Sequence, residues 1–201
     1  MIVYLGMPKC ASTWIWEKIR QNFDYKGIKE PHTLVELGEA NNNLVDFSTN
    51  NWSMDSSTAK KIDNDVSNYI FIIRDPVELA TSYYKQTAMP GESFNDFVYS
   101  LVKTKLICFG DIIERWYNLV DSNKILIYDY NKDIANNQEL FMNRLCKDLN
   151  LNDYDRSMPL QDKVLETKNK PTLECDQHLL DILKKQMDKF QDIVKLSLIH
   201  I

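Results

Sequence analysis

The chain alternates between short runs of apolar residues and longer stretches in which apolar residues recur every three or four positions. Three of the short runs are rich in β-branched and aromatic residues, over 2–6, 69–74 and 125–130. Because these runs are apolar throughout, they predict strands that are buried on both faces, as in a parallel sheet.

Helical periodicity fills the stretches between and after these runs. Apolar spacing of i, i+3, i+4 and i+7 predicts amphipathic helices over 94–102, 109–120 and 180–194. A further helix follows the first strand with Ser12 near its N-cap, and Pro76 stands at the first turn of another. Strands that alternate with helices predict a three-layer α/β fold, in which a central parallel sheet is flanked by helices.

Two segments fit this pattern less well. Residues 38–58 are rich in Asn, Ser and Thr and predict a long loop with at most one short element. The final LSLIHI does not continue the stripe of the preceding helix, so a frayed tail, an added strand and a foreign extension all stay open. We therefore expect one domain over 1–201, with 194–201 set apart as a candidate tail.

Composition narrows the class of protein. Hydrophobic residues make up 44% and charged residues 26%, which is typical of a soluble globular protein. The formal net charge of −5 disfavours a nucleic-acid partner, so an anionic ligand would have to be met by a local cluster. Neither a long apolar run nor a basic leader is found, and four cysteines lie far apart. These features predict a cytoplasmic location, no membrane contact, reduced thiols and no metal.

The segment GMPKCASTW (6–14) follows the first predicted strand and opens a helix. This arrangement aims backbone N–H groups and the positive end of a helix at one point, which favours an anion. Lys9 adds a full charge, and Ser12 and Thr13 add hydroxyl donors. An ordinary turn with an incidental lysine is the alternative.

The segment departs from the nucleotide-binding loop G-x-x-x-x-G-K-[ST]. Ala11 stands where the second glycine belongs, and Ser12 stands where the lysine belongs. Since a nucleoside triphosphatase needs that lysine beside the hydroxyl residue, the loop disfavours this class of enzyme.

The order P-K-x-[GA]-[ST]-T-W after a strand instead resembles the 5′-phosphosulfate loop of the P-loop sulfotransferases. Members of that family take 3′-phosphoadenosine 5′-phosphosulfate (PAPS) as donor and need no metal. The resemblance implies a P-loop-like fold, and it implies that Lys9 acts on the bridging oxygen as charge grows on the leaving phosphate. The donor-binding residues that it implies in this loop are Lys9, Cys10, Ala11, Ser12, Thr13 and Trp14. For the Cys10 side chain itself, a packing role is the favoured interpretation.

A second stretch, RDPVELATSYY (74–84), resembles the motif with which the same family binds the 3′-phosphate of the donor. The resemblance implies that Arg74 and Ser82 bind this phosphate. A capping turn, with Asp75 and Pro76 starting a helix, is the alternative.

Two later stretches resemble the family less specifically. KILIYDYNKD (124–133) is similar to a later strand and its acidic turn, and NRLCKDLNL (143–151) to the helix that follows. Lys170, within KNKPT (168–172), lies where the family has a basic loop over the donor, although a solvated lysine is equally compatible.

For the acceptor side we consider GIKEPH (27–32), which reads as the end of a short strand. Glu30 and His32 are two residues apart and therefore point to one side of an extended backbone. The stretch resembles the K-E-x-H-F-F segment of heparan-type glucosaminyl sulfotransferases, in which the glutamate is the base and the histidine supports it. Glu30 is our first candidate for the base and His32 the second, with a solvated pair as the alternative.

Departures from the heparan-type pattern fall on the same side. TLVE (33–36) replaces the aromatic residues, and DSST (55–58) puts Ser56 where an E-K-[ST]-P motif has lysine. The acceptor, a carbohydrate or a small molecule with a hydroxyl or amine, is therefore left open, and the low basicity disfavours a long polyanionic glycan.

The sequence thus predicts a PAPS-dependent, metal-independent sulfotransferase of a small bacterial or viral type. A small-molecule or nucleotide kinase with a degenerate Walker loop and a catalytically silent nucleotide-binding module are the alternatives. The oligomeric state is left open.

Overall fold

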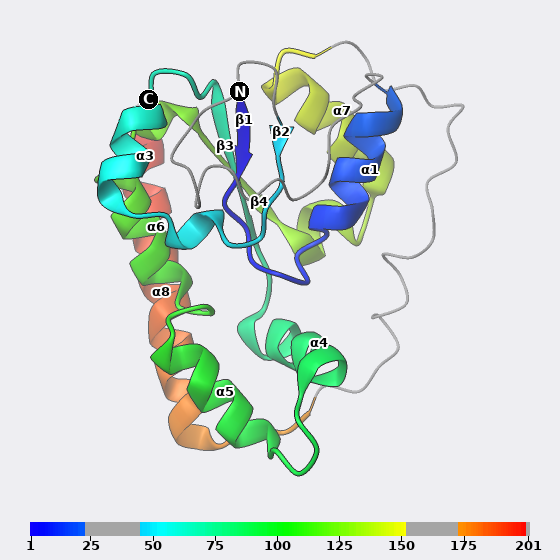
Figure 1. The fold of residues 1–201 in the computed structure, drawn as a ribbon, viewed down its shortest axis with the longest axis vertical. Helices are drawn as coiled ribbons and strands as arrows, with labels where there is room; N and C mark the ends of the chain where they lie inside the picture. The colour runs from blue at the N-terminus through cyan, green and yellow to red at the C-terminus, as the bar shows by residue number, and fades with distance from the viewer. Residues whose placement is uncertain (23–44, 152–172, 200–201) are drawn as a thin grey trace. The chain divides into compact units, whose positions relative to one another are not determined.

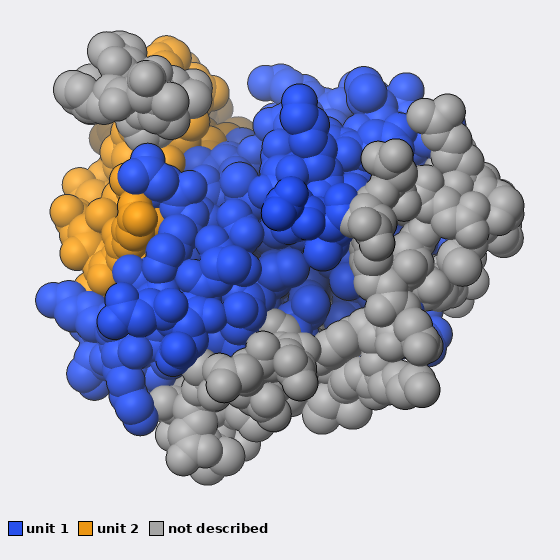
Figure 2. Space-filling view, turned by 90° about the horizontal axis from the view of Figure 1, so that it is seen from above, with its two compact units in different colours: residues 1–74, 123–170 blue, residues 75–122, 171–201 orange. Residues whose placement is uncertain are grey.

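A computed structural model describes residues 1–22, 45–151 and 173–199 of the chain. The chain divides into two compact units, which Figure 2 shows in different colours. Unit 1 comprises residues 1–74 and 123–170, and unit 2 comprises residues 75–122 and 171–201. The expectation of a single domain stays a prediction.

Unit 1 is built on a parallel sheet of four strands in the order β2-β1-β3-β4. Ile2 of β1 pairs with Asn68 of β3, and Tyr69 of β3 pairs with Ile125 of β4. The predicted parallel sheet and its three apolar strands are confirmed. The strands are β1 (Ile2–Tyr4), β2 (Val45–Asp46), β3 (Asn68–Ile73) and β4 (Ile125–Asp129).

Helices of unit 1 cover both faces of this sheet. Figure 1 shows α1 and α7 on one side of the strands and α3 on the other. On the first side, Phe141 of α7 packs between Trp14 of α1 and Tyr128 of β4, with ring centroids 6.2 and 5.2 Å away. The helical elements of unit 1 are α1 (Ser12–Asn22), α3 (Ser56–Ile62), α7 (Gln138–Asp148), the 3-10 turn η1 (Asn51–Ser53) and the π-helical turn η3 (Tyr130–Ile134). The 3-10 turn η2 (Ser122–Lys124) contains the last residue of one segment of unit 2 and the first two of the next segment of unit 1.

The prediction of a long loop over 38–58 is wrong for its described part, which holds β2, η1 and the start of α3. Asp55 caps α3 by accepting hydrogen bonds from the backbone N–H groups of Ser57 and Thr58, at 2.9 and 3.0 Å. Hydrogen bonds from both residues stabilise the carboxylate and lower the pKa of Asp55. DSST is therefore the start of a helix.

Helix α7 ends in a Schellman motif, which explains its sharp stop. Asn150 has a φ of 51°, the Leu151 N–H donates to the Cys146 carbonyl at 2.8 Å, and the Asn150 N–H donates to the Lys147 carbonyl at 3.0 Å. Asparagine tolerates this left-handed conformation better than most residues.

Unit 2 is helical in its described residues. Asp75 caps α4 through hydrogen bonds from the Val77 and Glu78 N–H groups, and Pro76 occupies the first turn, as the sequence indicated. Gly110 lets α6 and α8 approach closely, since a Cβ there would lie 2.6 Å from the Gln186 carbonyl oxygen. The helices are α4 (Pro76–Thr87), α5 (Phe94–Lys103), α6 (Phe109–Tyr117) and α8 (Gln177–Ile199).

The last helix extends further than its apolar stripe predicted. Residues 196–199 continue α8 as helical backbone, where the sequence had left a tail, a strand and an extension open. Within the residues that the structure describes, no helix combines the length and the apolar character needed to cross a membrane.

Candidate donor-binding site

The loop between β1 and α1 leads into a helix, and we first consider the backbone N–H groups of its first turn. The Ile15 N–H donates to the Ala11 carbonyl at 3.0 Å, which makes Ala11 the residue at which helical bonding begins. Among the described residues, no acceptor takes the backbone N–H groups of Ser12, Thr13 and Trp14. These N–H groups and the helix dipole favour an anion at this point.

Two residues of the loop adopt a left-handed backbone conformation. The φ angles of Lys9 and Ala11 are 67° and 62°, although neither residue is glycine. Such a conformation costs roughly 1–2 kcal/mol per residue. Ala11 occupies the place of the second glycine in the nucleotide-binding template, and its φ angle shows why that template asks for glycine.

Contacts from beneath hold the loop in this conformation. The Tyr4 hydroxyl lies 3.3 Å from the Met7 carbonyl oxygen and 3.1 Å from that of Cys10. Gly6 makes room for the Tyr4 side chain, because a Cβ on Gly6 would lie 2.2 Å from the tyrosine ring.

Arg74 joins the loop from the end of β3. Its Nη1 donates a hydrogen bond to the Lys9 carbonyl oxygen at 3.0 Å, and its guanidinium carbon lies 4.3 Å from the centroid of the Tyr130 ring. Tyr130 begins η3, directly after β4. Since β1, β3 and β4 are neighbouring parallel strands, the loop, Arg74 and Tyr130 meet at one edge of the sheet.

The other loop side chains differ in their exposure. Thr13 is exposed, Lys9 is partly exposed and Ser12 is buried. Trp14 is also buried, and its ring packs against α7, so its backbone N–H is the group that it presents at the helix start.

Cys10 is a buried thiol. Burial raises its pKa to about 12, and the nearby charge of Arg74 only partly opposes this rise. The thiol therefore stays protonated and unreactive, in agreement with a packing role, and any contact of Cys10 with an anion would come from its backbone.

The remaining predicted site residues lie elsewhere. Ser82 is on α4 in unit 2, where its side chain is partly buried. The Tyr84 ring of the same motif packs within unit 2 against Phe94 and Phe97, with centroids 5.4 and 5.3 Å away. The other three candidates, Glu30, His32 and Lys170, lie outside the described residues.

A buried carboxylate at the end of β2 was not predicted. Asp46 is 1% exposed, and its Oδ1 accepts hydrogen bonds from the Ser48 N–H at 2.8 Å and from Asn51 Nδ2 at 3.0 Å. Its second oxygen has no hydrogen-bond partner among the described residues. Tyr4 and Tyr130 were also missed as contributors to the loop region, because both stand in apolar runs that indicated strand alone.

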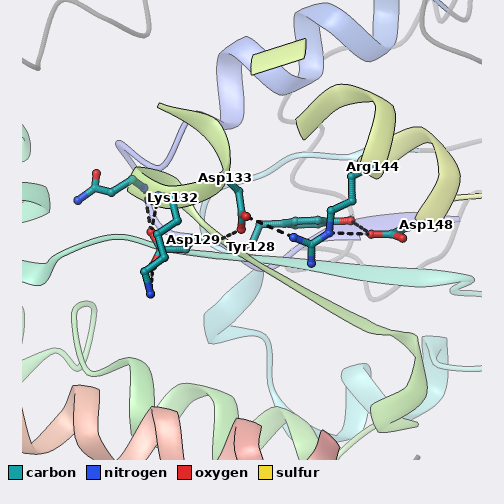
Figure 3. Close-up of polar contacts among 7 residues, drawn as sticks. Tyr128, Asp129, Lys132, Asp133, Arg144 and Asp148 are labelled. Carbon is teal, nitrogen blue, oxygen red and sulfur yellow. Dashed lines mark hydrogen bonds and ion pairs between the residues drawn. The ribbon is translucent and has the colours of Figure 1, made fainter. Parts of the chain in front are cut away.

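A polar network follows β4, as Figure 3 shows. The Tyr128 hydroxyl donates to Asp148 at 2.8 Å, and burial, followed by this carboxylate, raises the tyrosine pKa. Arg144 contacts Asp133 at 3.2 Å and Asp148 at 3.6 Å, and its guanidinium carbon lies 5.0 Å from the Tyr128 ring centroid. Asp133 in turn accepts the Asp129 N–H at 2.7 Å. The network fastens the end of β4 to α7.

We also searched the described residues for side chains that could bind a metal ion together. Across residues 1–22, 45–151 and 173–199, no group of three or more His, Cys, Asp or Glu side chains could hold a metal ion.

Comparisons with known proteins find similar structures but no match at the level of sequence families. No family model matches the chain. No curated protein matches it either. Among solved structures, it is similar to a sulfotransferase from Alicyclobacillus acidocaldarius, at 12% identity and a TM-score of 0.64, over 96% of this chain and 95% of that one. It is also similar to the mouse sulfotransferase SULT7A1 complexed with PAP, at 17% identity and a TM-score of 0.56, over 96% of this chain and 81% of that one. The chain therefore has the α/β fold of these sulfotransferases, with a parallel sheet flanked by helices.

Proposed function

We propose that the protein is a sulfotransferase that moves the sulfuryl group of PAPS to a hydroxyl or amine of a carbohydrate or small molecule. The observation that carries this proposal is the hydrogen bond from Arg74 to the Lys9 carbonyl. This contact joins Arg74, the first residue of one sequence signature, to Lys9 of the other. The sulfotransferase fold supports the proposal, as does the PAP complex of one structural neighbour.

The 5′-phosphosulfate would bind at the loop. The N–H groups at the start of α1 are suited to its oxygens, and the Lys9 ammonium and the hydroxyls of Ser12 and Thr13 would add to them. Cys10, Ala11 and Trp14 would contribute through their backbone. The Cys10 and Trp14 side chains are apolar and buried, and Ala11 has only a methyl group, whereas Ser12 has a hydroxyl.

The 3′-phosphate would bind to Arg74. A guanidinium has five N–H donors in a planar fork, and such a fork matches a phosphate well. We assign Ser82 and Lys170 to the same phosphate from the sequence motifs alone. The capping role of Asp75 and the binding role of Arg74 are compatible, because they use different side chains of the same turn.

The donor supplies the sulfuryl group, and the residues of the chain supply charge and proton transfer. Lys9 would neutralise the charge that grows on the leaving phosphate. Electrostatic stabilisation of this kind is usually the largest single contribution to the rate enhancement of an enzyme. Glu30, or His32 in its place, would take the proton of the acceptor. The proposed reaction is in-line and metal-independent, and we propose a cytoplasmic location for it.

Titration calorimetry tests this proposal directly. We expect 3′-phosphoadenosine 5′-phosphate (PAP) to bind at least about tenfold more tightly than ATP at one salt concentration, with no dependence on Mg²⁺, because a second phosphate site adds about 1.4 kcal/mol or more. Tighter binding of ATP that requires Mg²⁺ would favour a kinase instead. Absence of binding by either nucleotide would reject both enzymes.

A further inference from the structure

Tyr4 is the residue beneath the loop that no sequence signature includes. Its side chain is fully buried, and its ring stacks on Phe47 with centroids 5.1 Å apart and planes 12° apart. Its hydroxyl reaches the carbonyl oxygens of Met7 and Cys10, which lie three and six residues further along the chain. The one hydroxyl proton is thus placed between two carbonyl acceptors of the same loop.

The direction of the loop N–H groups follows from these contacts and from the geometry of the peptide bond. In a planar trans peptide, the carbonyl and the following N–H point in opposite directions, and the chain has no cis peptide among its described residues. A Cys10 carbonyl that faces Tyr4 therefore turns the Ala11 N–H away from the buried ring. Nests of this kind, with left-handed residues in alternation, gather N–H groups around an anion.

We propose that Tyr4 is a positioning residue that holds the loop in its anion-binding conformation before the ligand arrives. The left-handed residues Lys9 and Ala11 disfavour this conformation, so it needs contacts outside the loop. The ring alone does not provide them, because phenylalanine would stack on Phe47 equally well. The hydroxyl provides them. The identity of the anion, the 5′-phosphate of PAP, rests on the proposed function, whereas the positioning of the loop does not.

The test compares Tyr4→Phe with Tyr69→Phe. Tyr69 lies on the neighbouring strand β3, is also fully buried, and donates its hydroxyl to Asp63 at 3.2 Å. Each variant removes one buried tyrosine hydroxyl, but the Tyr4 hydroxyl contacts loop carbonyls, whereas that of Tyr69 is bonded to Asp63. We would measure loop exchange, meaning the hydrogen exchange of the Ile15 amide, which donates to the Ala11 carbonyl of the loop, without ligand, and the Kd of PAP by calorimetry.

We expect Tyr4→Phe to raise the rate of loop exchange about fivefold or more, and to raise the Kd of PAP about five- to tenfold. Tyr69→Phe should leave both quantities within about twofold of wild type. Unchanged loop exchange in Tyr4→Phe, or an equal rise in Tyr69→Phe, would overturn the proposal.

Two possible failures, absence of PAP binding and failure of Tyr4→Phe to fold, still leave the proposal testable. If the wild-type protein does not bind PAP, the proposed function fails, and the exchange rates alone decide the role of Tyr4. If Tyr4→Phe does not fold, Phe47→Leu keeps the hydroxyl but removes the ring that fixes its direction, so a hydroxyl that positions the loop should then hold it less well. Faster loop exchange in Phe47→Leu would then support the positioning role, and unchanged exchange would overturn it.

Discussion

Two arginines of unit 1 lie over tyrosine rings at the end of β4, in different surroundings: Tyr128 lies within the strand and Tyr130 directly follows it. Arg74 lies 4.3 Å from the Tyr130 centroid and Arg144 lies 5.0 Å from that of Tyr128. The Arg144 side chain is 51% exposed and contacts two carboxylates. Arg74 is only 6% exposed and contacts a carbonyl of the loop.

The difference shows that the same pairing of residue types serves two purposes. At Arg144, carboxylates of the protein meet the charge, and an exposed ion pair of this kind contributes little to stability or binding. At Arg74, a buried guanidinium donates to the loop that precedes the N-terminus of a helix, and positive charge in such a place favours an anionic ligand. We therefore expect ligand binding to depend on Arg74 and Tyr130. At the other pair, we expect stability to depend on the buried Tyr128 hydroxyl and not on the exposed Arg144.

The largest effect should come from Arg74→Ala. We expect it to weaken PAP binding about 100-fold, because hydrogen bonds to a charged group contribute about 1.5–3 kcal/mol and a bidentate contact makes two. The matched variant Arg144→Ala should change the affinity by less than about threefold. Calorimetry on both variants checks this, and equal losses would erase the distinction between the two arginines.

Removal of the ring beneath Arg74 should have the next largest effect. A desolvated cation–π contact contributes about 1–2 kcal/mol, so Tyr130→Leu should weaken PAP binding about tenfold. Tyr130→Phe keeps the ring and should bind within about twofold of wild type. Wild-type affinity in Tyr130→Leu would show that the ring does not position the guanidinium.

At the second pair, Tyr128→Phe should affect stability and its pH dependence. Burial, and then Asp148, raises the pKa of Tyr128 in the folded protein. The group thus contributes stability that is complete below its unfolded pKa of about 10 and is lost as the pH rises above that value. Loss of the hydroxyl should cost about 1 kcal/mol at neutral pH.

The same variant should also make the alkaline decline in the free energy of unfolding shallower, by up to about 1.4 kcal/mol per pH unit above pH 10. Denaturant titrations at pH 7.5 and 10.5 measure both effects, and PAP affinity serves as the control that should stay unchanged. Parallel pH profiles for the variant and the wild type would contradict the buried environment of this hydroxyl.

The smallest effect should come from Ala11→Gly, with Asn150→Gly as its counterpart at the end of α7. Glycine relieves a left-handed strain of about 1–2 kcal/mol and adds about 0.4–1 kcal/mol of unfolded-state entropy. We expect Ala11→Gly to stabilise the protein by about 1 kcal/mol or less, and Asn150→Gly by only a few tenths, since asparagine already tolerates this conformation. Thermal unfolding measures both, and a destabilised Ala11→Gly would contradict the left-handed loop.

The sequence predicted the elements whose signal is local. Continuous apolar runs indicate β1, β3 and β4, and the loop and Arg74 were found because each belongs to a short motif of fixed spacing. β2 was missed because it has only two residues in a polar stretch. The contact of Tyr130 with Arg74 joins residues far apart in the chain. The spacing of apolar residues and the residues typical of turns are local signals, so they do not predict such a contact.

The role of Tyr4 was hidden for a different reason. Its position in an apolar run indicates burial, which is correct, but the direction of its hydroxyl depends on the course of the loop above it. The stretch DSST (55–58) was also misinterpreted. We compared Ser56 with the lysine of an E-K-[ST]-P motif, whereas the stretch begins a helix that Asp55 caps.

The most direct test of the account is the preference for a 3′-phosphate, measured by calorimetry as the affinity ratio of PAP to adenosine 5′-phosphate in wild type and in Arg74→Ala. We predict that the wild type prefers PAP about 100-fold and the variant only about threefold, because Arg74 makes the bidentate contact with the 3′-phosphate and Ser82 and Lys170 add the remainder. An equal preference in both proteins would contradict this assignment.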